Sequence, residues 1–397
     1  MKLKILRLSS FLVCFSILLI SACSRAQGAD NYLGVTDSKI LLGTSLALTG
    51  HFSYLAVDYL EGALSYFNHI NDLGGIYNRK VKLISYNDRY EPYKTVVNTQ
   101  KLIHQDGVFM LFDYFGTPTT VKIIDMIHET KIPALGFFSG AETLRTPFRP
   151  MMFNVRSSYY IEAEALIAYF TLQYDFSRIA VVYQDDAFGI QGLKGVQMAL
   201  IRRNLEPIAT APYLKGGKDM GQAIERISKF QPEVVILIST AGPAIFFMEG
   251  MSKKGQFPYY SSFSVIGSNQ FSERIRSSKL LPLSVYKKIM MTQVFPNPKK
   301  NDLKVAGEYR EIYRRYYPKR EFNYESFEGF INAKVLIEAL KLAGEDLNRK
   351  KIVLALESMK NVDIGGFQIS YGVLDHNGLD DIYLTQLNSD GRFVEVV

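Results

Sequence analysis

The stretch Asp113-Tyr-Phe-Gly-Thr-Pro-Thr-Thr120 contains residue types that can bind a polar group. The apolar residues Val108 to Phe112 before it predict a strand, and Val121 to His128 after it predict a helix. A strand that turns at Gly116 into a helix leaves backbone N–H groups and hydroxyls available for an anion or a polar ligand head. Pro118 suits the first helical turn, where its missing N–H costs nothing. The alternative is that this stretch is one more ordinary strand-to-helix turn of a large protein, so the surrounding elements must decide between the two interpretations.

The surrounding segments alternate between strand and helix patterns. In the first third of the chain, strands are predicted at 40–48, 81–86, 108–112 and 132–136, with helices at 59–70, 92–105 and 121–128. This alternation is typical of a parallel, doubly wound α/β sheet. Ligands of such sheets bind beyond the carboxyl ends of the strands, which is where the 113–120 turn lies.

The same alternation then begins again. Further strands are predicted at 151–155, 178–183, 233–238, 258–262 and 286–294, with helices at 159–173, 189–203, 219–230, 243–254, 302–317, 326–343 and 349–360. A final hairpin is expected at 382–387 and 393–396, around the turn residues Asn388 to Gly391. Two α/β units predict two lobes, and the cleft between two lobes is a common ligand site.

The N-terminus has the parts of an export signal. Residues 2–7 carry three positive charges, and Phe11 to Ile20 form an apolar run that is too short to span a bilayer. The sequence Ile20-Ser-Ala-Cys23 resembles the bacterial lipoprotein signal, in which the cysteine becomes the lipid-bearing first residue. We therefore expect a signal peptide at 1–22 and lipidation at Cys23.

This leader places the protein in the periplasm, held to a bacterial membrane only by its lipid. Residues 23–37 form a tether, and Ser24 after the cysteine resembles the signal for sorting to the outer membrane. Ordinary secretion with cleavage after Ala26 is the alternative. The only other cysteine, Cys14, lies in the leader, so the exported body has no disulfide and no thiolate metal site.

Composition and motifs argue against several functional classes. The net charge of +7 includes the three leader charges, and the remaining positive charge is dispersed, so we expect no nucleic-acid partner. The five histidines lack metal-ligand spacing, and no Walker loop, His-Glu-x-x-His, Gly-x-Ser-x-Gly or Gly-x-Gly-x-x-Gly motif is present. The acid pairs Asp185-Asp186 and Asp380-Asp381 are more simply solvated charges than a catalytic pair. We therefore expect no enzyme activity, no metal and no cofactor.

Taken together, residues 38–397 resemble a known family. The chain is similar to the type 1 periplasmic binding proteins, in particular to the branched-chain amino acid (Leu/Ile/Val-type) substrate-binding proteins of ABC transporters. The motifs that carry the resemblance occur in the family's order at Leu42–Gly50, Glu61–Leu64, Asn71–Ile76, Tyr86–Pro92, Asp113–Thr120, Phe138–Glu142 and Tyr183–Gly189. Each motif alone is only weakly specific for the family, whereas their order and spacing together are specific.

The resemblance implies two lobes joined by a three-strand hinge, which close around a small ligand and then dock on a membrane permease. It implies a monomer. The crossovers are expected near Val155–Arg156, Gln293–Val294 and Ile369–Tyr371. The first lobe would then contain 38–155 and 295–369, and the second lobe 156–293 and 372–397.

The resemblance also implies a set of ligand contacts. In the family, hydroxyls and backbone N–H groups of two turns hold the ligand carboxylate, and aromatic side chains flank its body. The carboxylate site corresponds here to Gly116 and Thr117 on the first turn and to Ser139, Gly140 and Ala141 on the second. Tyr114 and Phe115, before the first turn, are further candidate ligand contacts. The flanking side chains correspond to Phe188 and to Tyr54 or Leu55, although Phe188 also suits simple packing at a helix start.

Two positions depart from the family pattern. The second-lobe aromatic is replaced by Ala241, and the acid that pairs with the ligand's α-amino group falls near Ser262, Phe263 and Ser264, where there is no carboxylate. A buried ammonium without its partner costs about 3–5 kcal/mol. We therefore expect a ligand with a carboxylate or other polar head and an apolar or aromatic body. An α-amino acid would need one of four other acids: Asp113, Glu142, Asp185 or Asp186.

The sequence thus predicts a solute-binding lipoprotein that delivers a small organic ligand to an ABC importer. The alternative is a lipoprotein of the same fold that senses a ligand or regulates a partner protein, with no role in transport. A ligand-sized cleft favours the first, and a filled cleft favours the second.

Overall fold

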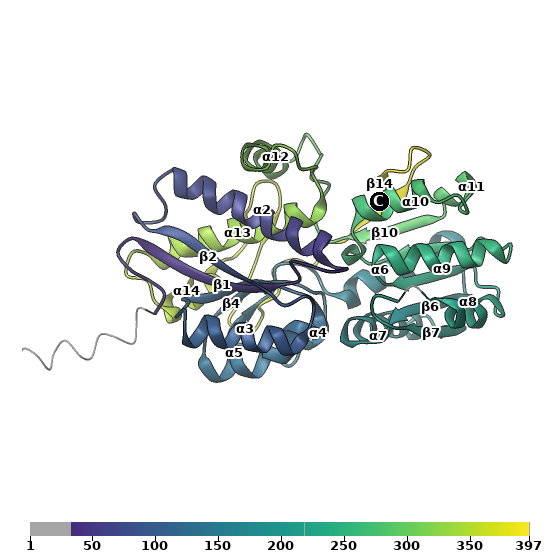
Figure 1. Ribbon diagram of the computed structural model, residues 1–397, viewed down its shortest axis with the longest axis horizontal. Coiled ribbons are helices and arrows are strands. Elements are labelled where there is room, and N and C mark those ends of the chain that lie inside the picture. Colours follow the sequence, from purple (N-terminus) through teal and green to yellow (C-terminus); the bar gives the residue numbers. More distant parts are fainter. Residues whose placement is uncertain (1–32, 218, 397) are drawn as a thin grey trace, which may run out of the picture.

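The computed structural model describes residues 33–217 and 219–396, which form two α/β lobes side by side (Figure 1). The predicted signal peptide, Cys23 and the tether as far as residue 32 lie outside the described residues. Within the described part of the chain, no helix is long and apolar enough to cross a membrane.

The first lobe is built on a parallel sheet with the strand order β2-β1-β3-β4-β5. Its strands are β1 (Lys39–Leu46), β2 (Lys80–Asn87), β3 (Met110–Phe115), β4 (Ala134–Phe138) and β5 (Met152–Phe153). Its helices are α2 (Ser53–Asp72), α3 (Pro92–His104), α4 (Thr117–Thr120), η2 (Val121–Ile123), α5 (Ile124–Thr130) and η3 (Glu142–Leu144), followed much later by α12 (Lys304–Tyr316), α13 (Tyr324–Ala343) and α14 (Arg349–Ser358). The short ribbon β11 (Val362–Asp363) and β12 (Gln368–Ile369) follows α14.

Helices cover both faces of this sheet, as expected for a doubly wound fold (Figure 1). Helices α3 and α5 pack on one face, while α12, α13 and α14 pack on the other with the C-terminal half of α2. Helix α13 lies against α2 although more than 250 residues separate their starts in the sequence. The chain therefore returns to the first lobe after it has built the second.

The second lobe contains a seven-stranded sheet with the order β14-β13-β10-β9-β8-β6-β7. Its strands are β6 (Ile179–Gln184), β7 (Ala209–Tyr213), β8 (Val234–Ile238), β9 (Tyr259–Ser262), β10 (Ile289–Gln293), β13 (Tyr383–Leu387) and β14 (Phe393–Glu395). The five strands from β7 to β10 pair in parallel, and the predicted terminal hairpin adds two antiparallel strands. Its helices are α6 (Tyr159–Tyr174), α7 (Ala187–Ile201), α8 (Gly221–Ser228), α9 (Ala241–Lys253), η4 (Ser264–Ile266), α10 (Ser268–Ser277) and α11 (Leu283–Tyr286).

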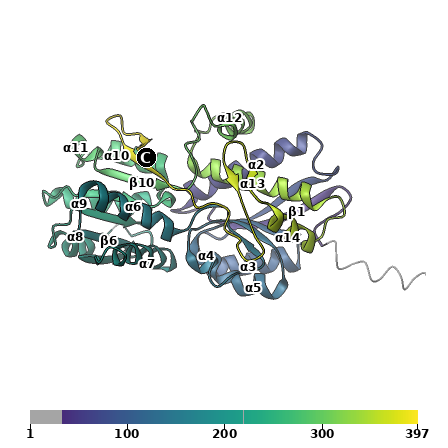
Figure 2. The same ribbon diagram turned by 180° about the vertical axis from the view of Figure 1, so that it is seen from behind.

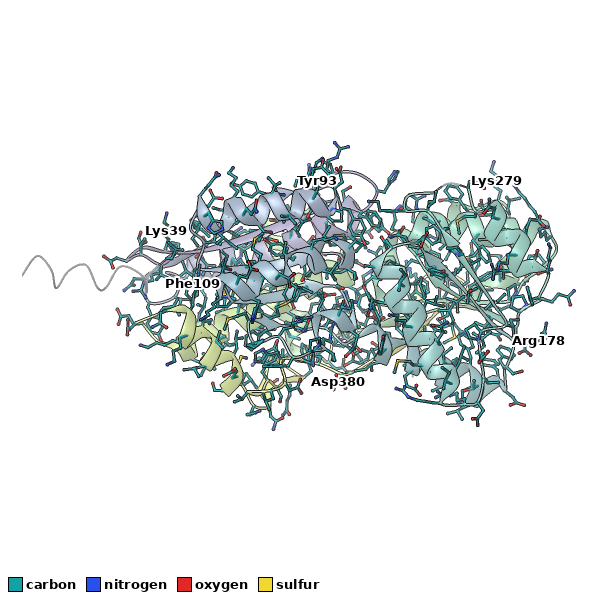
Figure 3. All side chains as sticks on the ribbon, turned by 90° about the horizontal axis from the view of Figure 1, so that it is seen from below. Lys39, Tyr93, Phe109, Arg178, Lys279 and Asp380 are labelled. Carbon is teal, nitrogen blue, oxygen red and sulfur yellow. The ribbon has the colours of Figure 1, made fainter. Side chains whose placement is uncertain are left out.

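The chain passes between the lobes three times: between β5 and α6, between β10 and α12, and between β12 and β13. The third passage is visible from behind in Figure 2 as the yellow end of the chain, and Asp380 on it lies near the middle of the molecule in Figure 3. Tyr371 and Leu379 are buried in the core of the first lobe. The chain therefore leaves this lobe after Leu379, about ten residues later than expected from the sequence.

The sequence prediction of an α/β fold with two parallel-sheet lobes is confirmed, and the local differences have physical causes. Strand β3 continues through Phe115 instead of ending at Phe112, and helix starts directly after Gly116 with Pro118 in its first turn. The sequence pattern did not predict β7, an edge strand that contains Pro212, because proline interrupts a strand pattern and is tolerated only at a sheet edge. Helix α10 was not predicted either, because its composition is mainly polar.

Candidate ligand-binding site

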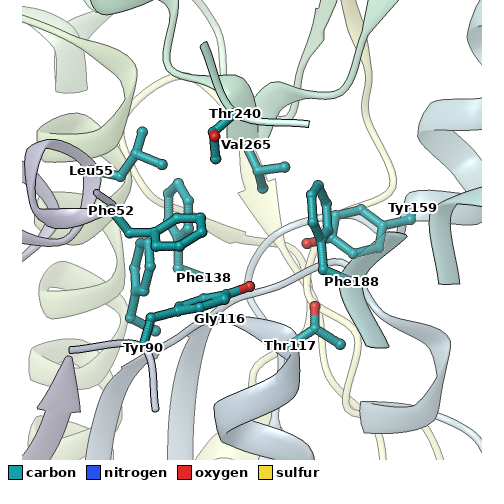
Figure 4. A pocket seen from close by; sticks show the side chains of 11 residues that line it. Phe52, Leu55, Tyr90, Gly116, Thr117, Phe138, Tyr159, Phe188, Thr240 and Val265 are labelled. Carbon is teal, nitrogen blue, oxygen red and sulfur yellow. The ribbon is translucent and has the colours of Figure 1, made fainter. Parts of the chain in front are cut away.

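A small aromatic cavity lies between the lobes at the carboxyl ends of β3 and β4 (Figure 4). Its volume is about 20 Å³, measured as the space open to the centre of a water molecule, which is room for about one water. None of its lining residues has a charged side chain. The lining residues are Phe52, Leu55, Tyr90, Phe115, Gly116, Thr117, Phe138, Tyr159, Phe188, Thr240 and Val265.

Aromatic rings from both lobes form the walls of this cavity. In the first lobe, Phe52 stacks on Tyr90 with ring centroids 4.0 Å apart, and Phe115 stacks on Phe138 at 5.0 Å. In the second lobe, Phe188 meets the edge of Tyr159 at 5.6 Å. Aromatic walls favour an apolar or aromatic ligand body, because they bury large apolar area and allow stacking.

Gly116 is required by the geometry of this wall. Its φ of 92° lies in the left-handed region, and a Cβ at this position would lie 2.3 Å from the ring of Tyr90. Only glycine combines this backbone conformation with such a close approach. The turn thus brings the backbone of β3 directly against the aromatic cavity.

The polar groups at the cavity are few. The Thr117 and Ser139 hydroxyls lie 2.7 Å apart and hydrogen-bond each other, and the N–H of Ala141 donates to the Ser139 hydroxyl over 3.2 Å. The hydroxyls of Thr119 and Thr120 donate to the Gly116 carbonyl. These two hydroxyls are satisfied by the backbone, so Thr117 supplies the hydroxyl of this turn that lines the cavity, and Ser139 is bonded to it from outside the lining.

Direct contacts hold the two lobes together across the cleft. The Tyr54 hydroxyl donates to the Ile266 carbonyl over 2.9 Å and accepts from the Ala241 N–H over 3.5 Å. Lys215 of the second lobe donates to the Tyr90 carbonyl over 3.2 Å, and its ammonium lies 5.3 Å from the Tyr90 ring. The structure is therefore a closed form, and admission of a ligand larger than water requires the lobes to separate.

The structure brings five of the thirteen predicted ligand contacts to the cavity: Leu55, Phe115, Gly116, Thr117 and Phe188. Thr240 and Val265 line it beside the predicted Ala241 and Ser264. The predicted residues outside the lining are Tyr54, Tyr114, Ser139, Gly140, Ala141, Ala241, Phe263 and Ser264.

Each of these eight residues has another contact in the closed form. The Tyr114 hydroxyl pairs with Thr99, and Phe263 stacks on Tyr159 behind the cavity wall. The Gly140 carbonyl accepts from the Tyr159 N–H over 2.7 Å. Ser264 accepts from Arg156 through its hydroxyl and donates to Glu162 through its N–H. Tyr54, Ser139, Ala141 and Ala241 make the contacts described above.

Sequence reasoning missed six lining residues: Phe52, Tyr90, Phe138, Tyr159, Thr240 and Val265. Two of them lie within motifs that the sequence analysis singled out, since Tyr90 belongs to Tyr86–Pro92 and Phe138 precedes Ser139. An aromatic residue beside a candidate binding turn was the available signal. The others depend on how the lobes meet, which no local pattern shows.

None of the four acids that could replace the missing ammonium partner lines the cavity. Asp113 accepts from Tyr59 and Asn332, each over 2.8 Å, and burial raises the pKa of its carboxyl well above the ordinary value. Asp186 caps helix α7 through the N–H groups of Phe188 and Gly189. Glu142 accepts from Thr146 and Asp185 is exposed.

A larger polar groove lies between the lobes beyond Tyr54. Its volume is about 1000 Å³, and it is bordered by α10 and by the start of α13. Two carboxyls border it: burial raises the pKa of Glu325 to about 8 and that of Asp58 to about 6. Tyr54 borders this groove, and its neighbour Leu55 lines the aromatic cavity.

A buried charge cluster links the lobes behind the cavity. Arg156, on the first passage, lies 3.8 Å from Glu162 of the second lobe and 3.5 Å from Glu328 of the first. All three side chains are almost completely buried. The guanidinium also lies 4.9 Å from the Phe138 ring, so the cluster supports one wall of the cavity from behind.

Comparison with known proteins identifies the family to which this fold belongs. The family model described as periplasmic binding protein matches residues 39–392. An amino acid binding protein of Pseudomonas aeruginosa is 23% identical over 55% of this chain and 60% of its own length, so this chain matches less than two thirds of that relative. A Leu/Ile/Val-binding protein homolog of Brucella suis is 20% identical over 85% of each chain.

Solved structures agree with this assignment. A possible leucine/isoleucine/valine-binding protein from Rhodopirellula baltica superposes with a TM-score of 0.84 at 25% identity, covering 93% of this chain and 98% of that one. A branched chain amino acid ABC transporter protein from Thermus thermophilus with bound valine has the same fold, with a TM-score of 0.80 at 18% identity over 91% and 96% of the chains. The chain belongs to the periplasmic binding protein family, a family of solute-binding proteins rather than enzymes.

Proposed function

We propose that this protein is an exported, lipid-anchored solute-binding protein that captures a small organic ligand between its lobes and delivers it to an ABC importer. The observation that carries the proposal is the aromatic cavity at the junction of the two lobes, next to the turn at Gly116. The Leu/Ile/Val-binding homolog and the valine-bound relative support the same general role.

The chemistry of the cavity supports a ligand class. Six aromatic rings and no charged side chain line it, so the ligand has an apolar or aromatic body. The Thr117–Ser139 hydroxyl pair and the neighbouring backbone would hold a carboxylate or amide head. An obligatory α-ammonium is disfavoured, because the lining offers it no carboxylate.

A thermal-shift screen tests this proposal. The purified protein would be tested against amino acids, aromatic and aliphatic acids, amides and nucleosides. A ligand present at about 100 times its dissociation constant adds about 2.7 kcal/mol, which is a measurable rise in melting temperature. The Phe188→Ala variant should lose the shift, since Phe188 supplies an aromatic wall. A shift that Phe188→Ala retains in full would place binding elsewhere.

The closed cavity of about 20 Å³ also favours a second candidate, a lipoprotein of this fold that regulates a partner protein. In that case the cleft stays filled by its own aromatic side chains. Small-angle scattering separates the two candidates. A solute-binding protein populates a more extended open form that ligand closes, whereas a partner-regulating protein keeps the closed dimensions with and without small molecules.

A further inference from the structure

A separate polar cavity lies beside the passages that join the lobes. Its volume is about 180 Å³ by the same water-centre measure, so it has room for more than a single water. It shares no lining residue with the aromatic cavity. The polar side chains that line it include Arg145, Arg149, Asn154, His376 and Asn377.

Arg145 brings a buried positive charge to this cavity. The residue is only 8% exposed, and its guanidinium donates to three backbone carbonyls, those of Ala141, Arg156 and Ser157. Among the residues that the structure describes, it has no ion pair within 4.0 Å. Glu142 and Asp380 act on it only from a longer distance, and burial lowers the pKa of its guanidinium to about 10. A buried cation of this kind is stabilised by a counter-charge.

Other polar atoms at the cavity also lack partners. The Arg149 Nε, the Asn154 Oδ1 and the Asn377 Oδ1 are buried and make no hydrogen bond. Asn154 is only 2% exposed, and its amide can present either N–H groups or its oxygen to a ligand. Both ring nitrogens of His376 have partners, the Met152 carbonyl at 3.2 Å and the Glu357 carboxylate at 3.4 Å. Two of these unpaired atoms are amide oxygens, which accept hydrogen bonds, so the unpaired buried donor at the cavity is the Arg149 Nε.

We propose that this cavity binds a small oxyanion, and that the guanidinium groups of Arg149 and Arg145 hold it. A planar guanidinium suits phosphate, sulfate and carboxylate oxygens, since all of them accept its N–H groups in pairs. The cavity lies next to the hinge. Arg145 donates to the Arg156 carbonyl on the first passage, and the backbone of Asn154 is hydrogen-bonded to His376 and Gly378, shortly before the third passage.

Isothermal titration calorimetry of the purified protein tests the proposal. The probes are inorganic phosphate, sulfate and acetate at constant chloride and ionic strength, which separates inorganic from carboxylate sources. The main variant is Arg149→Gln, because the buried Nε of Arg149 makes no hydrogen bond within the described part of the chain. Arg226→Gln, at an exposed position of α8 in the second lobe, is the matched control.

Saturable binding of at least one probe is expected, weakened about tenfold or more by Arg149→Gln, as for the loss of one charge-assisted hydrogen bond. Arg226→Gln should bind like the parent protein. The proposal is overturned if no probe binds saturably at millimolar concentrations, because water alone then fills the cavity. Binding of equal strength in the parent and in Arg149→Gln also overturns it, since the anion then lies elsewhere.

Discussion

The hydroxyl of Tyr54 in the first lobe donates a hydrogen bond to the carbonyl of Ile266 in the second lobe over 2.9 Å. This bond crosses the cleft between the aromatic cavity and the polar groove, and it belongs to the closed form only. Because hinge motion separates its partners, it contributes to the balance between open and closed states rather than to the stability of either lobe. Tyr54 thus stabilises the closed form through a contact between the lobes, whereas the sequence predicted it as a ligand contact.

Replacement of Tyr54 by Phe tests whether the hydroxyl stabilises the closed form. The variant keeps the ring and loses the bond to the Ile266 carbonyl as well as the longer one from the Ala241 N–H, so the closed state should be destabilised by at least about 0.5–1.5 kcal/mol. We expect a larger mean radius of gyration in small-angle scattering without ligand, and no change in melting temperature large enough to indicate damage to a lobe. Unchanged scattering would show that the bond does not influence closure.

The turn at Gly116 gives a second prediction. Gly116→Ala places a methyl group against the Tyr90 ring at a φ of 92°, so it should destabilise the first lobe by about 1–3 kcal/mol and abolish ligand-induced shifts. The matched control is Gly242→Ala in α9, where a Cβ would meet no atom within 4 Å. That control should be neutral or slightly stabilising, because alanine favours helix. Equal effects of the two substitutions would refute the steric argument.

The buried carboxyl of Glu325 predicts a pH dependence. Its pKa is raised to about 8 in the folded protein, chiefly by burial and then by the charge of Asp58. Between its ordinary value and about pH 8, the folded state therefore holds a proton that the unfolded chain has lost, so its contribution to stability falls as pH rises through this window. The loss is complete above that range.

Glu325→Gln removes this dependence, since glutamine stays neutral. Relative to the parent protein, the variant should gain free energy of unfolding, of the order of a few kcal/mol, between about pH 5 and about pH 8.5 in urea titrations. Glu129→Gln, at an exposed position of α5, is the control. A difference between Glu325→Gln and the parent that does not vary with pH would contradict the assignment of a neutral buried carboxyl.

The Arg156 cluster gives a fourth prediction. Arg156→Met leaves Glu162 and Glu328 buried without a cation, which should cost about 3–5 kcal/mol in free energy of unfolding. Adding Glu162→Gln and Glu328→Gln to the same chain should recover part of that loss, because no buried charge then remains. Arg202→Gln, in a half-exposed pair with Glu164, serves as the surface control and should change stability far less. Equal losses from the two arginine substitutions would contradict this reasoning.

The fold could be predicted from the sequence because its elements follow local patterns. Alternating strand and helix segments predicted both sheets, and the order of loose motifs predicted the family, which the match over residues 39–392 confirms. The path of β3 could not be predicted in this way. Asp113 has a φ of 54° within that strand, and its carboxyl is held by Tyr59 and by Asn332, which is 219 residues away in sequence.

The candidate site could be predicted only in part for the same reason. Gly116 and Thr117 lie on a turn whose sequence already indicates binding. Phe52 and Tyr90 reach the cavity because they stack on each other, although they come from different loops. Thr240 and Val265, rather than their neighbours Ala241 and Ser264, face the cavity because the lobes meet at that register. A shift of one residue at a helix start is beyond what motif matching resolves.

The most direct test of the account compares two ligand pairs that differ only in an α-amino group: phenylalanine with 3-phenylpropionate, and leucine with 4-methylpentanoate. Isothermal titration calorimetry on the purified protein would measure all four affinities. We predict that in each pair the acid without the amino group binds at least as tightly as the amino acid, because the aromatic cavity offers no carboxylate to an ammonium. Amino acids that bind more than about tenfold tighter than their deaminated partners would contradict it.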